Sequence, residues 1–595
     1  MIPIKSNEKN AIVLVSLLLL FITGTLLISL VPRSVRFTNK KLETLDGETI
    51  SVNIAEPIRG LKIPQNTPAV IIGHGYMANK EFMKGYALEI AAAGFVVVTL
   101  DFRGHGQSTG SLDRNRLLFD VLAVKTYLAS RLDVDIHNLA YIGYSMGGFP
   151  GNLIVNSDPD FKAFIGVGTS LQYGLRQGNS SHPLNVLMIH AKYDEAFNLE
   201  VLRNVVGLRA GKLSPLIDVN QLYGNFQEGN ATMIYLDDNS NHLSVAWDTD
   251  FIRASRNWLI NTFPTVLTAD EDFYGHLRLL ILILQVIGGF GVFFSLMYML
   301  SRAFGFHPST QIEDIEGKKN DNNTKEEEIK DYAETSIHME FESRLQIDIG
   351  DTTSLRLFFL TLLYTLIFGI IGIFLIVWAF LFIPQPIIGF VFGLLFGASF
   401  GILLLIYRLG KKREISLKAI LKKPFTDSKK DLAKYVVLGI ILAGFLYLIL
   451  YLSFGRNYIG IVPSIIKAPW IPLYSVIAFL IFFVYGLYIF LIVKPKLVNR
   501  RLATLKIIII HFGILFIYVN AILLAMGLLT GSFFFWGVMI PVSTPLLIIS
   551  ACVDTISFKR TGNIIMGALI NAIYFTVIVT TIAPFQGLFT LFSVF

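Results

Sequence analysis

The stretch LAYIGYSMGG, residues 139–148, decides the fold of the amino-terminal half of this chain. Its first part, Leu139–Gly143, is a short apolar run typical of a buried β-strand. The strand leads into Gly143-Tyr144-Ser145-Met146-Gly147, a Gly-x-Ser-x-Gly pattern that sets a serine on a strand–turn–helix elbow. Gly143 and Gly147 suit this elbow because its backbone is strained and crowded. A helix amino terminus beneath the serine favours developing negative charge, so the stretch predicts that Ser145 is a nucleophile.

The pattern alone arises by chance in glycine-rich chains, so its surroundings carry the argument. Short apolar or β-branched runs alternate with segments of helical length. The expected strands are Ala69–Gly73, Phe95–Leu100, Leu139–Gly143, Phe161–Val167, Asn185–His190 and Thr232–Leu236. This alternation predicts an α/β domain with βαβ units, a mostly parallel sheet and helices on both of its faces.

A nucleophilic serine needs a base, and the base needs an orienting acid. Asp194 follows the expected strand Asn185–His190, at the carboxyl end where open α/β sheets place their sites. His242 follows the last expected strand, and the order Ser, Asp, His is the one this fold requires. We therefore expect Ser145 as nucleophile, His242 as base and Asp194 as acid, with Glu195 as the alternative acid.

A second loop is suited to binding an oxyanion. His74-Gly75-Tyr76 follows the expected strand Ala69–Gly73, and a glycine there lets the backbone approach a substrate. We expect the amide N–H groups of Tyr76 and Met146 to form the oxyanion hole, with Met77 as an alternative to Tyr76. The side chain of His74 is expected to hold the loop by hydrogen bonding.

These motifs together resemble α/β-hydrolases of the serine aminopeptidase and monoacylglycerol-lipase-like branch. The resemblance covers residues 36–265 and rests on three elements. They are His74-Gly75, the segment Asp101-Phe102-Arg103-Gly104-His105-Gly106-Gln107-Ser108, and Gly143–Gly148 with its extra glycine. The resemblance implies that Asp101, Arg103, Gly104 and Gly106 shape the active-site edge of the sheet. A phosphate-binding loop is excluded at 101–108 because no Gly-Lys-Ser/Thr follows.

One departure from the family leaves the substrate open. Many relatives carry a large cap before the acid-bearing strand, and here the short segment between Thr169 and Asn185 has no room for several helices. Fold and triad therefore transfer, whereas a lipase or peptidase substrate does not. A longer segment, Glu200–Asn230, is expected to cover the site in part, and short soluble esters are expected to be accepted.

The rest of the chain has the composition of a membrane protein. The 595 residues are 53% hydrophobic, with a mean hydropathy of +0.59. Much of this apolar content forms runs of about 20 residues, the length that crosses a bilayer. The expected spans are residues 11–31, 278–300, 355–383, 386–407, 433–453, 471–493, 507–529, 533–552 and 563–583.

These spans divide the chain into segments with different surroundings. We expect a cytoplasmic amino terminus (1–10), a transmembrane anchor (11–31), the hydrolase domain (36–265), a transmembrane helix (278–300), a charged flexible cytoplasmic linker (301–354) and a multi-spanning domain of about seven helices (355–583). The alternative for 11–31 is a cleaved signal peptide. Its apolar run is longer than that of such peptides, which favours a retained anchor.

The distribution of charge gives the orientation. Lys and Arg are concentrated in alternate loops, at 408–434, 494–506 and 559–560, whereas the loop at 383–386 carries no charge. The positive-inside rule then predicts a multi-pass protein of the cell membrane with the hydrolase domain outside the cytoplasm. The same distribution accounts for the net charge of +7, so we expect no nucleic-acid partner.

The membrane half carries no motif that names a function. Gly389, Gly393, Gly397 and Gly401 recur every four residues and are expected to allow close helix packing. His511 and Asn520 lie in one expected span without charged partners, so we expect them to make interhelical hydrogen bonds. The single cysteine, Cys552, excludes an intrachain disulfide and a multi-cysteine metal site, and neither a metal nor an organic cofactor is expected.

The sequence as a whole predicts a membrane-anchored serine hydrolase. It would cleave an ester, thioester or amide of a small-molecule or peptide substrate through an acyl-enzyme. One alternative is an acyltransferase that uses the same triad. Another is a ligand-sensing domain that gates a transporter or channel, which would not need an intact triad. The sequence does not identify any protein partner.

Overall fold

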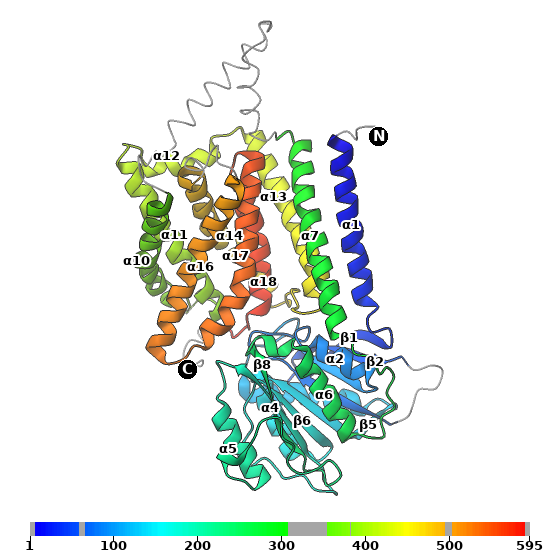
Figure 1. Ribbon diagram of the computed structural model, residues 1–595. Coiled ribbons are helices and arrows are strands. Elements are labelled where there is room, and N and C mark those ends of the chain that lie inside the picture. Colours follow the sequence, from blue (N-terminus) through cyan, green and yellow to red (C-terminus); the bar gives the residue numbers. More distant parts are fainter. Residues whose placement is uncertain (1–5, 59–65, 307–353, 381, 494–501, 589–595) are drawn as a thin grey trace.

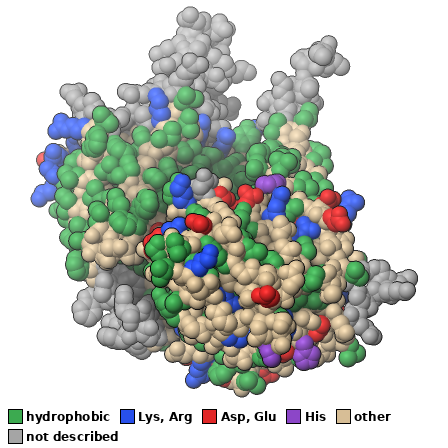
Figure 2. All heavy atoms as spheres, turned by 60° about the horizontal axis from the view of Figure 1, so that its bottom comes forward, with side chains coloured by type: hydrophobic (Ala, Val, Ile, Leu, Met, Phe, Trp, Pro, Cys, Tyr) green, Lys and Arg blue, Asp and Glu red, His purple; other side chains and the backbone are tan. Residues whose placement is uncertain are grey.

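The computed structural model describes residues 6–58, 66–306, 354–380, 382–493 and 502–588, and a sheet-containing domain lies beneath a bundle of long helices (Figure 1). Most of the expected linker 301–354 and part of the basic loop 494–506 lie outside the described residues. The sides of the bundle are largely hydrophobic (Figure 2). Charged side chains are scattered over the sheet-containing domain and gather at the end of the bundle farther from that domain (Figure 2).

The domain is built on one eight-stranded sheet. Its order is β1-β2-β4-β3-β5-β6-β7-β8; β2 runs antiparallel to both of its neighbours, and the remaining pairs are parallel. The strands are β1 (Val35–Glu43), β2 (Thr49–Pro57), β3 (Thr67–Gly73), β4 (Val96–Leu100), β5 (Val134–Tyr144), β6 (Phe161–Val167), β7 (Asn185–Tyr193) and β8 (Thr232–Asn241). The expected α/β class is confirmed, and the edge strand β1 and its neighbour β2 are additions to the six predicted strands.

Helices cover both faces of the sheet, and alternate strand residues enter two different cores. Ala69 and Ile71 of β3 pack with α3 (Leu117–Ala129), α4 (Gly148–Ser157) and α5 (Leu199–Ala210). Val70 and Ile72 pack instead with α2 (Lys84–Ala92) and α6 (Thr249–Thr262). This alternation follows from the two-residue period of a strand, and it explains why the parallel strands are apolar throughout.

The bundle contains nine long helices among the described residues, and each expected span overlaps one of them. They are α1 (Ser6–Ser29), α7 (Gly275–Ala303), α10 (Ser354–Phe380), α11 (Pro386–Lys411), α13 (Lys429–Leu450), α14 (Ile471–Tyr488), α16 (Ala503–Thr530), α17 (Phe534–Thr561) and α18 (Ile565–Ile582). Eight of these, some with their flanking turns, are long and apolar enough to cross a membrane, and α10 contributes a shorter apolar stretch, Leu355–Ile371.

Shorter elements complete the chain. They are α12 (Leu417–Lys422), π-helical turns at Tyr451–Gly455 and Ile489–Val493, and 3₁₀ turns at Arg114–Arg116, Ser145–Gly147, Ser214–Leu216, Ser244–Ala246, Lys423–Phe425 and Ala468–Trp470. Arg278, near the start of α7, lies at the end of the bundle next to the sheet. Most other basic residues of the bundle helices lie at the other end, where Arg408 and Lys411 end α11 and Lys559 and Arg560 end α17. This end is the one farther from the sheet (Figure 1).

The bundle contacts the sheet-containing domain through specific polar contacts. The buried side-chain amide of Asn79 donates to Gly460 O (2.8 Å) and accepts from Gly460 N (2.9 Å). The segment after α18 runs along the loop that follows β4, where Phe585 N donates to Gly104 O (2.8 Å) and Leu112 N donates to Phe585 O (2.7 Å). These contacts hold the membrane helices against the carboxyl edge of the parallel strands.

Packing inside the bundle confirms the expectation for the glycine stripe. A Cβ added at Gly397 would lie 2.7 Å from the carbonyl oxygen of Gly369, and one at Gly401 would lie 2.5 Å from that of Tyr364. Both carbonyls belong to α10. The glycines therefore let α10 and α11 approach closely, as small residues do in membrane helices.

The expectation for the two polar residues of α16 holds for only one of them. Asn520 Oδ1 accepts a hydrogen bond from Trp536 Nε1 of α17 (3.2 Å). His511 Nε2 instead lies 4.0 Å from a carboxylate oxygen of Asp554 on α17, without a hydrogen bond. The titratable neighbour Asp554 was not anticipated, because it lies just past the end of the expected span 533–552.

Candidate active site

Ser145 sits on the sharp turn between β5 and α4. Its φ is 49°, a left-handed conformation that a non-glycine residue adopts only under constraint. Space on both sides is short: a Cβ at Gly143 would lie 2.6 Å from Gly148 Cα, and one at Gly147 would lie 2.5 Å from Gly73 O. The small residues are thus needed because the turn packs directly against β3. The strain exposes Ser145 at the end of the strand.

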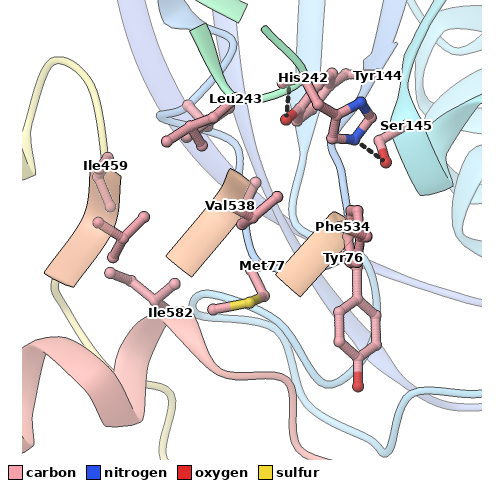
Figure 3. Close-up of a pocket in the computed structure, with 13 residues that line it drawn as sticks. Tyr76, Met77, Tyr144, Ser145, His242, Leu243, Ile459, Phe534, Val538 and Ile582 are labelled. Atoms are coloured by element: carbon pink, nitrogen blue, oxygen red, sulfur yellow. Dashed lines mark hydrogen bonds between the residues drawn. The ribbon is translucent and has the colours of Figure 1, made fainter. Parts of the chain in front are cut away.

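The three residues expected to form the triad lie within hydrogen-bonding distance of one another. His242 Nε2 is 3.0 Å from Ser145 Oγ, and His242 Nδ1 is 3.1 Å from both carboxylate oxygens of Asp194 (Figure 3 shows the first contact). The His242 and Asp194 side chains are almost fully buried. This arrangement fixes the tautomer, because Nδ1 donates to Asp194 and Nε2 is left to accept from Ser145.

Asp194 is held as an ionised acceptor. Burial favours its neutral form, but hydrogen bonds from His242 and from the backbone N–H groups of Ala196 (2.9 Å) and Phe197 (3.0 Å) outweigh burial, so the pKa of Asp194 lies below its ordinary value. Glu195, the alternative acid, does not contact the imidazole; its Oε2 accepts from His242 N (3.3 Å), and burial raises its pKa. The geometry therefore favours Asp194 as the partner of the ring.

Aromatic rings enclose the His242 imidazole. Tyr144 stacks on it with ring centroids 5.6 Å apart, and Phe197 lies at 5.5 Å. The third ring is Phe534, the first residue of α17, whose centroid lies 5.8 Å away in an edge-to-face arrangement. The membrane half therefore contributes directly to the surroundings of the proposed base.

Two histidines fix the loop at 74–77: His74 within it and His105 from the loop that follows β4. His74 Nδ1 donates to Gly75 O (2.7 Å) and its Nε2 accepts from Phe102 N (3.1 Å); burial lowers the pKa of His74 to about 4, so the ring is neutral. His105 Nε2 donates to Tyr76 O (2.7 Å). These bonds hold the loop against the elbow, and a Cβ at Gly75 would lie 3.1 Å from Ser145 Cβ.

The two expected oxyanion donors lie next to Ser145. Met146 follows it in the 3₁₀ turn Ser145–Gly147, and Tyr76 lines the same cavity as Ser145. Within the described residues, the N–H of Tyr76 donates to no protein atom. Gln586, which follows α18, donates a hydrogen bond from Nε2 to the Tyr76 hydroxyl (2.6 Å). An unused backbone donor beside a nucleophile is the feature an oxyanion hole requires.

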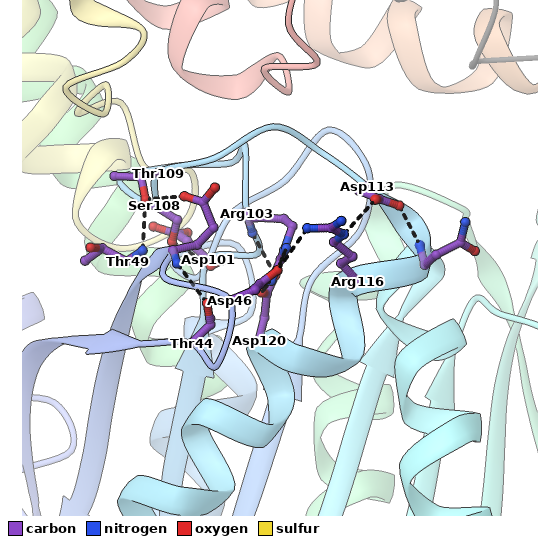
Figure 4. A network of polar contacts seen from close by, with 12 residues as sticks. Thr44, Asp46, Thr49, Asp101, Arg103, Ser108, Thr109, Asp113, Arg116 and Asp120 are labelled. Carbon is purple, nitrogen blue, oxygen red and sulfur yellow. Dashed lines mark hydrogen bonds and ion pairs between the residues drawn. The ribbon is translucent and has the colours of Figure 1, made fainter.

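Asp101 and Arg103 lie behind the loop in ion-pair networks. Arg103 pairs with Asp46 (2.6 Å) and Asp120 (2.7 Å), and these hydrogen-bonded carboxylates outweigh burial and raise its pKa (Figure 4). Asp101 accepts from Lys80 Nζ (2.7 Å) and from Lys80 N (2.7 Å), and all of these atoms are buried. The contacts are those of residues that shape the loop, in agreement with the role implied by the resemblance.

The cavity at Ser145 is covered in part by the helical bundle. Its volume is about 40 Å³, and its 13 lining residues come from both parts of the chain. The hydrolase domain supplies Tyr76, Met77, Ala78, Phe82, Tyr144, Ser145, His242 and Leu243, and the membrane half supplies Ile459, Phe534, Val538, Val542 and Ile582. The missing cap left only Glu200–Asn230 as an expected cover, so the contribution of the helical bundle was not predicted.

The segment expected to cover the site does not reach it. None of Glu200–Asn230, all of which the structure describes, lines the cavity. The residues that do cover it belong to the expected spans 533–552 and 563–583 and to the loop before residue 471. The sequence around these residues is that of any apolar helix. It does not distinguish a valine that faces a nucleophile from one that faces lipid.

Comparisons with known proteins concern part of the sheet-containing domain. A family model described as alpha/beta hydrolase fold matches residues 68–206. Two uncharacterized proteins of Mycobacterium tuberculosis are each 30% identical over 80 residues, which is 13% of this chain and 28% of theirs. The matched segment thus spans little more than a quarter of these relatives.

Solved structures resemble the domain at low sequence identity. An esterase from Pyrococcus furiosus is 13% identical with a TM-score of 0.30, covering 38% of this chain and 92% of the esterase. A prolyl endopeptidase is 16% identical with a TM-score of 0.30, covering 40% of this chain and 38% of the endopeptidase. The family match, together with the sheet order and the serine elbow, leads to one conclusion. The chain contains an α/β-hydrolase domain joined to a bundle of long apolar helices.

Proposed function

We propose that the protein is a membrane-anchored serine hydrolase that cleaves an ester, thioester or amide through an acyl-enzyme. The observation that carries this proposal is the hydrogen-bonded series from Ser145 through His242 to Asp194, with Ser145 at a strained turn that lines a cavity. A domain that only bound a ligand would not need a nucleophile, a base and an orienting acid in contact with one another.

The proposed reaction has two halves. Ser145 Oγ bonds to the substrate carbonyl carbon while its proton passes to His242 Nε2, and Asp194 stabilises the imidazolium. The oxygen anion receives hydrogen bonds from the N–H groups of Tyr76 and Met146. The leaving group takes the proton from His242 as its bond to the carbonyl carbon breaks. Water then attacks the acyl-enzyme by the same route, and an acid is released as Ser145 regains its proton.

The proposed location is the cell membrane, with the hydrolase domain outside the cytoplasm. The support is that Arg408, Lys411, Lys559 and Arg560 end helices at the side of the bundle farther from the sheet. Basic residues remain on the cytoplasmic side during insertion. The opposite end, where the hydrolase domain lies, then faces outward.

The test is hydrolysis of 4-nitrophenyl esters by the purified full-length protein and two variants. Ser145→Ala should lose turnover by at least about 10³-fold, since no nucleophile remains. Ser180→Ala removes the hydroxyl of an exposed serine and should behave as the wild type. Near-wild-type turnover by Ser145→Ala would contradict the proposal, and so would a wild-type protein that turns over no ester and binds no fluorophosphonate.

A further inference from the structure

The cavity at Ser145 has a wall that continues into the membrane-spanning bundle. Three of its lining residues, Phe534, Val538 and Val542, follow one another at intervals of four along α17. Residues spaced in this way lie on one face of a helix, and eight residues advance by about 12 Å along its axis. The apolar stripe therefore begins beside the His242 ring and leads away from the hydrolase domain.

The chemistry of this wall suits a hydrocarbon. Among the described residues that line the cavity, none is Lys, Arg, Asp or Glu, and the five from the membrane half are all Ile, Phe or Val. The lining residues with polar side-chain atoms are Tyr76, Tyr144, Ser145 and His242, and all four belong to the hydrolase domain. A carbonyl beside these residues would have partners, whereas a charged or polar group farther along the wall would have none.

The cavity is smaller than a long hydrocarbon chain, so α17 must move when such a chain binds. The volume of about 40 Å³ holds a few water molecules, whereas pockets for larger ligands measure roughly 300 to 1,000 Å³. Pro541 and Pro545 lie inside α17, and each lacks the N–H that would bond to the carbonyl four residues earlier. The carbonyls of Gly537 and Pro541, in the part of the helix that carries the stripe, therefore lack their usual backbone donors.

We propose that the acyl group of the substrate is a hydrocarbon chain that lies along α17, with its carbonyl at Ser145 and its tail beside Val538 and Val542. The substrate is then an acyl lipid whose chain enters the cavity from the membrane. This inference rests on the proposed function and adds its substrate class. Val538 and Val542 set the length of chain that fits, because they lie at increasing depth from the nucleophile.

The first experiment measures kcat/KM of the full-length protein in lipid nanodiscs for 4-nitrophenyl acetate, octanoate and dodecanoate. Burial of even two further methylene groups is worth about tenfold, so octanoate should exceed acetate by at least that factor. Val538→Phe should lower the octanoate-to-acetate ratio by about tenfold or more. Val542→Phe, farther from Ser145, should lower the dodecanoate-to-octanoate ratio instead.

Ile548→Phe is the matched control, since Ile548 is on the same helix but is 42% exposed and outside the cavity. It should leave both ratios unchanged. Fluorophosphonate labelling of every variant reports whether the site is still assembled. A wild-type protein that prefers acetate, or ratios that Val538→Phe and Val542→Phe do not move, would overturn the inference.

A second experiment needs no variant. A fluorophosphonate with a long alkyl chain that ends in a photoreactive diazirine should attach to Ser145 and crosslink to α17 near Val542. Crosslinks confined to the hydrolase domain would overturn the inference. The proposed function fails separately, when the wild type shows neither labelling nor turnover of any ester; labelling with acetate turnover but no chain-length preference rejects only the hydrocarbon site.

Discussion

The ring of Phe534 lies 5.8 Å from the ring of His242, edge to face, although the two residues are far apart in the chain and belong to different halves of the protein. His242 follows the last strand of the hydrolase sheet, and Phe534 begins a membrane helix. This contact joins the proposed base to the bundle. The residues that surround the proposed active site therefore come from both parts of the chain.

Replacing Phe534 should therefore impair catalysis. Aromatic pairs of this kind contribute about 0.5 to 1.5 kcal/mol beyond the area they bury, so Phe534→Ala should lower kcat/KM roughly two- to tenfold and leave Ser145 reactive. Phe535→Ala is the control, because Phe535 is 39% exposed and lines no part of the cavity. Steady-state kinetics of both variants check this, and equal effects would show that the contact is unimportant.

The identity of the acid is tested by a neighbouring pair. Asp194→Asn should lower kcat by about 10⁴-fold, because the uncharged amide no longer supports the imidazolium or the correct tautomer. Glu195→Gln should change kcat by less than about threefold, because Glu195 contacts the backbone N–H of His242 and not its ring. The expected order of activity is wild type, then Glu195→Gln, then Asp194→Asn; a reversed order of the two variants would make Glu195 the acid.

Much of this site could be predicted from sequence because its signals are local. The Gly-x-Ser-x-Gly elbow carries its own steric reason, and the six parallel strands are continuous apolar runs. The strand β1 was not predicted because it is an exposed edge strand rich in Lys, Arg and Asn, with little hydrophobic pattern. The parallel sheet was predictable to the extent that its strands are buried on both faces.

The cover of the site could not be predicted, because it depends on contacts between distant segments. Phe534, Val538 and Val542 have the sequence of an ordinary membrane helix, and only the folded chain shows which side meets His242. The same holds for His511, which was assigned no charged partner. Asp554 lies beyond the expected end of the next helix, and only the observed length of α17 brings it to His511.

The two hydrogen bonds between Asn79 and Gly460, which join the sheet-containing domain to the bundle, should contribute to stability. Asn79→Ala removes both hydrogen bonds to Gly460 and leaves its buried N–H and carbonyl groups unpaired, which should cost roughly 2 to 4 kcal/mol. The apparent Tm of the detergent-solubilised protein should fall by several degrees. Asn39→Ala, at an exposed asparagine of β1, should not change it. A Tm that is the same for both variants would contradict a stabilising role for the Asn79–Gly460 hydrogen bonds.

Acid should destabilise the hydrolase domain through His74. The pKa of His74 is lowered by burial to about 4 in the folded protein, whereas an unfolded histidine titrates near about 6.5. The folded state therefore binds fewer protons in this interval, so its stability is full above about pH 6.5 and declines as pH falls toward 4, by up to about 3 kcal/mol. Comparison of Tm at pH 7 and pH 5 should show a smaller decrease for His74→Gln than for the wild type; equal decreases would exclude this residue as the cause.

The proposed orientation predicts which loops a protease reaches. A protease-cleavable tag inserted at Asn179, in the loop before β7, should be cut from outside in intact cells, because it belongs to the hydrolase domain. A tag inserted within 318–324 should be protected until the cells are permeabilised. Immunoblotting distinguishes the fragments. Cleavage of the second tag alone in intact cells would indicate the opposite orientation.

The most direct test of the central claim, that Ser145 is the nucleophile, is to locate the label of a fluorophosphonate by mass spectrometry. Trypsin cleavage after Arg131 and Lys162 yields the peptide Leu132–Lys162, which contains both Ser145 and Ser157. We expect a single modification of this peptide, which fragmentation assigns to Ser145. The same peptide of the Asp194→Asn variant should carry no label after a short exposure. Modification of a different serine, or an unmodified peptide after full exposure of the wild type, would contradict the central claim.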